Sequence, residues 1–371
     1  MNGAKIYISL LLLLCLAGCG RSERSQIKAA VGQELGHLGK GTYQVSSSTS
    51  AKEELFSDSL LSEASEVYAK FFEGFRYKVE KINYQKGDDT ATAIIGAHTR
   101  DGSALAKSYA KAQLREEMLR RATGGPLPLT DEDLYRLLGD LLDGGDIPSL
   151  DNRFEMQLQK TGDHWKVSKT EALENALVGG FLSSSHNPYL LTPAETLGTW
   201  FDTLRGMDTI TMSTYLGLDG FDEGQRRYAA ALMGQIKKYF NYQILSTEET
   251  SSGSATVQVA ITSFCDEAID EAYRKALREY LSTADAVIDG EEARYENACR
   301  LLVECIENNE VTSQVYVSFQ MYHDGTSWCL AQNENEDLGQ AIFGTLSGTL
   351  VSMEETREEE IEEVEEEIEE E

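Results

Sequence analysis

Two similar stretches of sequence decide the fold: Ala91–Ile95, which reads ATAII, and Ala255–Ile261, which reads ATVQVAI. In the second stretch Val257, Val259 and Ile261 occupy alternate positions. Such alternation of apolar side chains is typical of a strand that buries one face. Both stretches run on into a segment with helical periodicity, so the sequence predicts the same strand–helix arrangement twice.

The two copies stay in register well beyond these strands. On the helix after each strand the matching positions lie 164 residues apart: Ala104, Tyr109, Lys111 and Ala112 match Ala268, Tyr273, Lys275 and Ala276. Later matches lie 163 residues apart, so the second copy has lost one residue. On the helix, Leu114–Glu116 match Leu277–Glu279. On the following strand and turn, the matching pairs are Phe154 and Val317, Met156 and Phe319, Leu158 and Met321, Gly162 and Gly325, and Trp165 and Trp328. Register that persists through helix, strand and turn predicts an internal duplication.

Amphipathic helices open each copy. In the first copy seven apolar residues form one stripe: Leu60, Ala64, Val67, Tyr68, Phe71, Phe72 and Phe75. In the second copy Thr192–Glu195 forms a capping box with Pro193 at the first helical position, and a later stripe runs from Tyr228 to Tyr239. A short helix is expected over 131–142. The order per copy is helices, two strands, a long helix, a shorter helix, two strands and a closing helix, which predicts an α+β architecture.

The length of 371 residues is sufficient for two such domains. We expect six segments along the chain: a signal peptide at 1–18, an anchor and tether with a first helix at 19–49, the first α+β repeat at 50–182, a linker at 183–191, the second α+β repeat at 192–350, and an acidic tail at 351–371. The linker is predicted from the loop-forming composition of Ser183–Pro188.

The composition excludes some classes of protein. Hydrophobic residues make up 41% of the chain, which argues against a fully disordered protein. The 33 basic residues are outnumbered by 63 acidic ones, and the formal net charge is −30. Because binding to nucleic-acid phosphates needs a basic surface, we expect no nucleic-acid partner.

The N-terminus has the pattern of an export signal. Lys5 precedes an almost entirely apolar run from Ile6 to Ala17, which is shorter than the roughly 20 residues of a membrane-spanning helix. The run ends in Leu16-Ala17-Gly18-Cys19, which resembles the lipobox of bacterial lipoproteins. The resemblance implies acylation of Cys19, cleavage after Gly18, and an extracytoplasmic protein anchored by lipid to the bacterial cell membrane. Two acyl chains are sufficient for stable anchoring. The alternative is an ordinary secretory signal with a chance cysteine.

The order and size of the two repeats are similar to those of NTF2-like or cystatin-like domains. Tandem domains of this kind occur in bacterial lipoproteins of uncharacterised role. The resemblance covers roughly residues 50–182 and 192–347. It implies two similar domains, each a curved antiparallel sheet packed on a long helix.

Four cysteines remain after Cys15 and Cys19 are set aside: Cys265, Cys299, Cys305 and Cys329. An even number in an exported chain is compatible with disulfides. On one helix Cys299 and Cys305 would have Cα atoms about 9 Å apart, beyond the disulfide limit of about 7 Å. Each can therefore pair only with Cys265 or Cys329. Four buried free thiols remain the alternative.

Candidate catalytic residues are few. His164 and His323 lie beside Asp163 and Asp324 at hairpin turns, where an oriented general base is conceivable. Turn formation is the favoured interpretation of these aspartates. Paired aromatic residues could line a cavity, but core packing is favoured for them: Tyr109, Tyr273, Trp165 and Trp328. We expect no catalytic residues, no cofactor and no metal.

The tail Glu354–Glu371 contains 13 glutamates and one arginine. Ile361, Val364 and Ile368 recur at helical spacing, which permits an amphipathic helix that docks on a partner. We nevertheless expect a solvated tail, because dense like charge opposes helix formation.

These patterns together indicate a membrane-anchored, non-catalytic binding or scaffolding protein. Its ligand would be a small molecule, an envelope polymer or an envelope protein. Two alternatives remain: an enzyme that uses an NTF2-like cavity, and thiol–disulfide exchange by the second domain.

Overall fold

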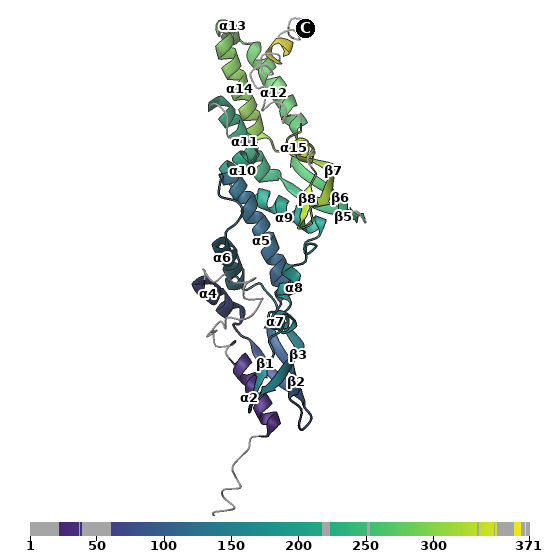
Figure 1. The fold of residues 1–371 in the computed structure, drawn as a ribbon. Coiled ribbons are helices and arrows are strands. Elements are labelled where there is room, and N and C mark those ends of the chain that lie inside the picture. Colours follow the sequence, from purple (N-terminus) through teal and green to yellow (C-terminus); the bar gives the residue numbers. More distant parts are fainter. Residues whose placement is uncertain are drawn as a thin grey trace, which may run out of the picture. The chain divides into compact units, whose positions relative to one another are not determined.

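The structure is a computed structural model that describes residues 22–36, 38, 61–216, 223–250, 253–331, 334–344, 346, 360–364 and 368. The predicted signal peptide and Cys19 lie outside these residues. The described residues form two compact units (Figure 1). The first comprises those up to Tyr109 together with Thr130–Asn187, and the second comprises Ala110–Leu129 together with those from Pro188 onward. Each unit is α+β and contains one four-stranded antiparallel sheet.

The first sheet has the strand order β1-β2-β3-β4. Its strands are β1 (Arg76–Asn83), β2 (Thr90–Arg100), β3 (Ser149–Thr161) and β4 (His164–Val167). The helices that begin in this unit are α2 (Glu23–Leu35), α4 (Leu61–Phe71), α5 (Gly102–Thr123), α6 (Asp131–Asp143), α7 (Glu171–Leu177) and α8 (Phe181–Ser185). The helices expected at 131–142 and along the stripe from Ala64 to Phe71 are therefore present.

The buried face of this sheet packs on α2. Ile27, Val31 and Leu35 recur every four residues along α2 and are almost completely buried. They lie on one face of a helix because side chains four positions apart share a face. The sequence predicts a long helix on this sheet, but the apolar residues of α5, the longest helix described, are buried in two separate places, at Leu105 and at Met118. A short helix with a continuous stripe therefore covers this sheet instead.

A polar contact fixes the first turn of α2. The Glu23 carboxylate accepts hydrogen bonds from Lys160 Nζ and Trp165 Nε1, both at 2.7 Å. The hydrogen bond from Lys160, and then that from Trp165, hold the pKa of Glu23 below its usual value.

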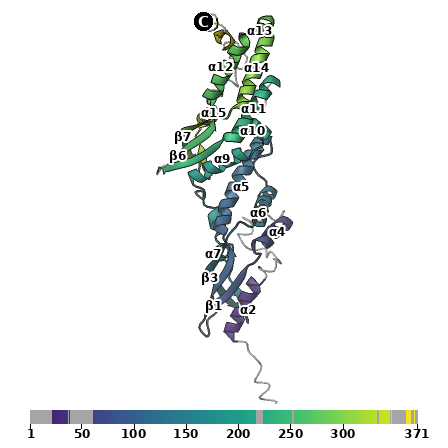
Figure 2. The same cartoon turned by 180° about the vertical axis from the view of Figure 1, so that it is seen from behind.

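The second sheet has the strand order β5-β6-β7-β8. Its strands are β5 (Asn241–Glu249), β6 (Ser254–Phe264), β7 (Thr312–His323) and β8 (Trp328–Leu330). The helices of this unit include α9 (Pro193–Gly206), α10 (Thr209–Tyr215), α11 (Glu223–Tyr239), α12 (Asp266–Leu281), α13 (Ala284–Ile288), α14 (Glu291–Asn308) and α15 (Glu334–Phe343). Figure 2 shows this sheet from behind, and α9, α11 and α15 pack against it. The predicted capping box of Thr192 and Glu195 is confirmed at the start of α9.

The two sheets agree in detail. In each, the pairing of the first two strands shifts by one residue, between Val79 and Lys81 in one sheet and between Ile244 and Ser246 in the other. Both second strands are paired along their length with the third strand of their sheet. In both units a helix precedes the first strand, helices separate the second strand from the third, and a helix follows the fourth strand. The number of intervening helices differs, with α5 and α6 in the first unit and α12, α13 and α14 in the second.

The acidic tail departs from expectation. Residues 360–364 are helical, and Ile361 and Val364 are 8% and 1% exposed. Both belong to the hydrophobic core of the second unit, and Arg274 Nη1 lies 3.6 Å from Glu363 Oε2. The prediction of a solvated tail is therefore wrong for this segment. Burial of the apolar stripe, aided by one ion pair, outweighs the repulsion between neighbouring glutamates.

Candidate functional site

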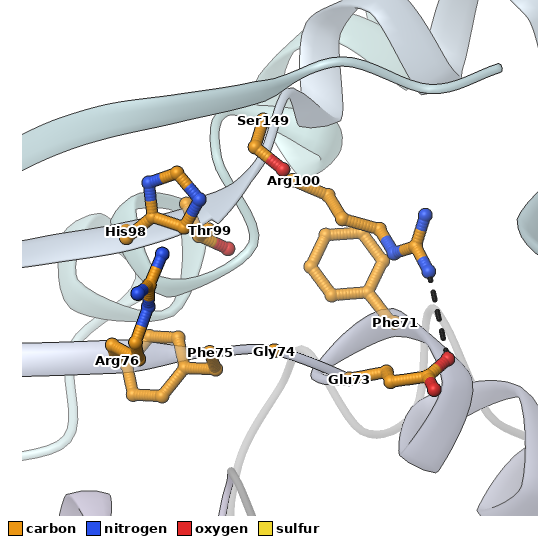
Figure 3. A pocket seen from close by; sticks show the side chains of 9 residues that line it. All are labelled: Phe71, Glu73, Gly74, Phe75, Arg76, His98, Thr99, Arg100 and Ser149. Atoms are coloured by element: carbon orange, nitrogen blue, oxygen red, sulfur yellow. Dashed lines mark ion pairs between the residues drawn. The ribbon is translucent and has the colours of Figure 1, made fainter. Parts of the chain in front are cut away.

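A pocket of about 400 Å³ opens in the first unit where α4 ends and three strands meet (Figure 3). Its walls come from the turn after α4, the start of β1, the end of β2 and the start of β3: Phe71, Glu73, Gly74, Phe75, Arg76, His98, Thr99, Arg100 and Ser149. A volume of this size is typical of sites for small ligands.

Strand pairing brings the polar side chains of the pocket together. Arg76 is paired with His98 across β1 and β2, and Arg100 is paired with Ser149 across β2 and β3. Paired residues of neighbouring strands project from the same face, and so do residues two apart on one strand. His98 and Arg100 therefore lie on the outer face of the sheet, opposite the face that packs on α2. Gly74, with φ of +77°, turns the chain between α4 and β1.

Arg100 is the most deeply placed charged group of the pocket. Its side chain is 14% exposed, and its Nε is buried without a hydrogen-bond partner. Among the residues that the structure describes, its nearest counter-charge is Glu73, whose Oε2 lies 3.8 Å from Arg100 Nη2 and whose side chain is 78% exposed. A contact of this length is an ion pair without a hydrogen bond. The guanidinium is therefore only partly compensated by the protein.

His98 and Arg76 occupy the other end of the pocket, where Figure 3 shows them beside each other. His98 Nδ1 lies 2.9 Å from Asp151 Oδ1, and the Asp151 side chain is 91% exposed. Arg76 has no ion-pair partner among the residues that the structure describes. Phe71 and Phe75, 7% and 8% exposed, provide the apolar part of the wall. This combination of cationic and apolar groups can hold an anion that carries an apolar portion.

No group of three or more histidine, cysteine or carboxylate side chains suited to a metal ion occurs among the described residues.

The sequence did not single out Arg76, His98 or Arg100. The alternation in β2 contained the only usable indication. Its inward positions are small or apolar up to Ala97, while the last outward positions are His98 and Arg100. Two cationic residue types at the end of an otherwise uncharged strand suggest a polar site. Their partner Arg76 could be found only from the strand register.

The four cysteines considered as possible disulfide partners lie in the second unit, and all four are free thiols in the structure. Cys299 and Cys305 are both on α14, Cys265 precedes α12, and Cys329 is on β8. Burial raises the pKa of Cys305 and of Cys329. A raised pKa lowers the thiolate fraction, which opposes thiol–disulfide exchange at these two positions.

The hairpin histidine His323 is held by the backbone. Its Nε2 lies 2.9 Å from the Pro188 carbonyl, and its Nδ1 accepts a hydrogen bond from Gly325 N. Asp324 accepts hydrogen bonds from Thr326 and Ser327, and these bonds lower its pKa. The turn interpretation of Asp324 therefore agrees with the contacts, because its side chain serves the hairpin.

The paired aromatic residues are mostly in the core. Tyr273, Trp165 and Trp328 are 0%, 6% and 5% exposed. Tyr109 is half-buried, with its ring centroid 6.2 Å from that of Phe181. None of these residues lines the pocket beside Arg100.

Comparisons with known proteins define no family for this chain. No protein-family model matches it, and no curated protein matches it significantly. One solved structure that it resembles is ycdA of Bacillus subtilis, described as a candidate lipoprotein. The two are 11% identical, the match covers 72% of this chain and 96% of that chain, and the TM-score is 0.28. Within the described ranges, no helix combines the length and apolarity needed to cross a membrane.

Proposed function

We propose that this chain is an extracytoplasmic protein, anchored to the bacterial membrane through acylated Cys19, that binds a ligand and has no enzymatic role. The pocket around Arg100 is the observation that carries the binding function. A buried guanidinium without adequate protein partners is costly, and a bound anion would compensate its charge. The anchor rests on Leu16–Cys19, because an apolar run followed by this motif is what lipoprotein processing requires.

We also propose that the two units arose by duplication of one NTF2-like or cystatin-like domain. The equal strand orders, the matching shifts in register and the sequence offset of 164 and then 163 residues support a common origin. Fold by itself does not specify activity, so the site must carry the functional argument.

The anchor is tested by replacing Cys19 with alanine in full-length protein expressed in a bacterial host. The expected result is loss of metabolic labelling with palmitate and movement of the protein out of the membrane fraction. Cys15→Ala is the matched control, because Cys15 lies within the signal segment. Unchanged labelling and membrane fractionation of Cys19→Ala would refute the anchor.

An enzymatic role is the second candidate, because Ser149, His98 and Asp151 are the residue types of a nucleophile, a base and an orienting carboxylate. The hydrogen bond between His98 and Asp151 is present at 2.9 Å. Ser149 makes no hydrogen bond to His98, and the orienting carboxylate is exposed to water. This geometry favours binding over catalysis.

Labelling with a fluorophosphonate probe separates the two candidates. We expect no labelling of the native chain. Stoichiometric labelling that Ser149→Ala removes, and that Ser168→Ala leaves intact, would establish the hydrolytic alternative.

A further inference from the structure

We infer that the pocket of the first unit binds a small carboxylate attached to an apolar group, with Arg100 holding the carboxylate. This inference rests on the proposed binding function and names the chemical class of its ligand. Three properties of the pocket lead to it: an under-compensated guanidinium, a net charge of one unit, and an apolar wall.

The first property is the environment of Arg100. A guanidinium offers five N–H donors and is always charged. Here the side chain is only 14% exposed, Nε lacks a hydrogen-bond partner, and the nearest carboxylate of the described residues is 3.8 Å away on the exposed Glu73. Buried charges in proteins are normally paired and hydrogen-bonded. A carboxylate is the group that matches the planar fork of an arginine in two parallel hydrogen bonds.

The second property is the charge balance. Arg76 and Arg100 contribute two positive charges, and Glu73 contributes one negative charge. Asp151, the carboxylate 2.9 Å from His98, is 91% exposed and does not line the pocket. The pocket therefore has an excess of one positive charge. This excess matches a carboxylate better than a phosphate, which carries up to two negative charges at neutral pH.

The third property is the apolar wall. Phe71 and Phe75 line the same pocket as Arg100 and Arg76 (Figure 3). The rings are already mostly buried, so a ligand would cover only the faces that remain open. A carboxylate bound between the cationic groups would place an apolar substituent over these rings. Burial of that substituent would add to the affinity.

The test uses the full chain, extracted from membranes in a non-ionic detergent, and titration calorimetry. The probe is 3-phenylpropionate, which joins one carboxylate to one apolar ring. Three compounds isolate its parts: 3-phenylpropanamide lacks the charge, acetate lacks the ring, and phenyl phosphate carries a phosphate in place of the carboxylate. We expect 3-phenylpropionate to bind more tightly than all three. Equal or tighter binding of the amide or of phenyl phosphate would overturn the carboxylate assignment, and equal binding of acetate would overturn the role of the apolar wall.

Two substitutions should change the affinity in opposite directions. Arg100→Met removes the charge at similar volume and should weaken binding by about 10- to 100-fold, the loss of a hydrogen-bonded charge. Glu73→Gln removes the carboxylate that competes for Arg100 and should tighten binding by about two- to five-fold. Arg153→Gln is the control, because Arg153 lies on the same sheet face, is paired with Glu80 at 2.9 Å and does not line this pocket. Unchanged affinity in both test variants would refute the inference.

Thermal unfolding of the same proteins distinguishes a binding role from a structural one. A buried charge without good partners does not stabilise the fold, so Arg100→Met should leave the melting temperature unchanged or raise it. A large decrease would show that Arg100 is structural and would overturn its assignment as the ligand-binding group. Glu73→Gln keeps the test informative in that case, since its gain of affinity needs an intact Arg100. Absence of probe binding refutes this inference alone, whereas membrane retention of Cys19→Ala refutes the anchor of the proposed function.

Discussion

Replacing Val364 with alanine should destabilise the second unit, although this residue lies in a tail of glutamates. The Val364 side chain is 1% exposed and belongs to the core of that unit. Truncation to alanine removes two methyl groups, equivalent to about 1.6 kcal/mol of transfer free energy at 0.8 kcal/mol each, and the cavity left behind raises the cost to roughly 2 kcal/mol. For a unit of about 200 residues this corresponds to a decrease of about 4–8 °C in melting temperature.

The measurement is thermal unfolding of the full chain, followed by circular dichroism. Glu362→Ala is the matched control, because Glu362 lies two positions away in the same helical segment and is exposed. Its melting temperature should stay within about 1 °C of the parent protein, as is usual for surface substitutions. If Val364→Ala and Glu362→Ala melt together with the parent, the tail contributes nothing to the core and the reasoning fails.

Three further predictions concern titrating groups and thiols. The lowered pKa of Glu23 means that its carboxylate stabilises the fold at neutral pH. This contribution should be lost as the pH falls below about 4.3, the pKa of a glutamate in the unfolded chain. The fluorescence of its hydrogen-bond partner Trp165 should therefore change on acidification in the parent but not in Glu23→Gln. Burial raises the pKa of Tyr242 to about 12, so the difference in alkaline absorbance between the parent and Tyr242→Phe should develop near pH 12, and a difference complete by pH 10 would contradict the burial. Non-reducing mass spectrometry should find no bond between Cys299 and Cys305, because α14 holds them about 9 Å apart, and detection of that bond would contradict the helix.

Much of the fold could be predicted because its determinants are local. Alternation of buried residues in Ala255–Ile261 marks a strand, and the capping box of Thr192 and Glu195 marks a helix start. Both depend on residues within a few positions of one another. The choice of helix that covers the first sheet is different. It depends on whether apolar residues form one continuous stripe, as in α2, or two patches, as in α5.

The candidate site could not be predicted because it depends on contacts between residues distant in sequence. Arg76, His98 and Ser149 are far apart in sequence and meet only when the strand register is known. A slip of one residue would move each side chain to the opposite face of the sheet. The packing of the tail could not be predicted either, because it depends on an apolar surface of the second unit formed by residues far from the tail in sequence.

The division of the chain into units has a consequence for its biosynthesis. Residues 110–129 belong to the second unit, yet they precede 130–187, which belong to the first. During translation Met118 and Ala122 leave the ribosome long before the remainder of the core that buries them. Neither unit can be completed from one uninterrupted stretch of polypeptide. A single proteolytic cut within 183–191 would therefore not release one unit per fragment, because the N-terminal fragment would retain part of the second unit's interior.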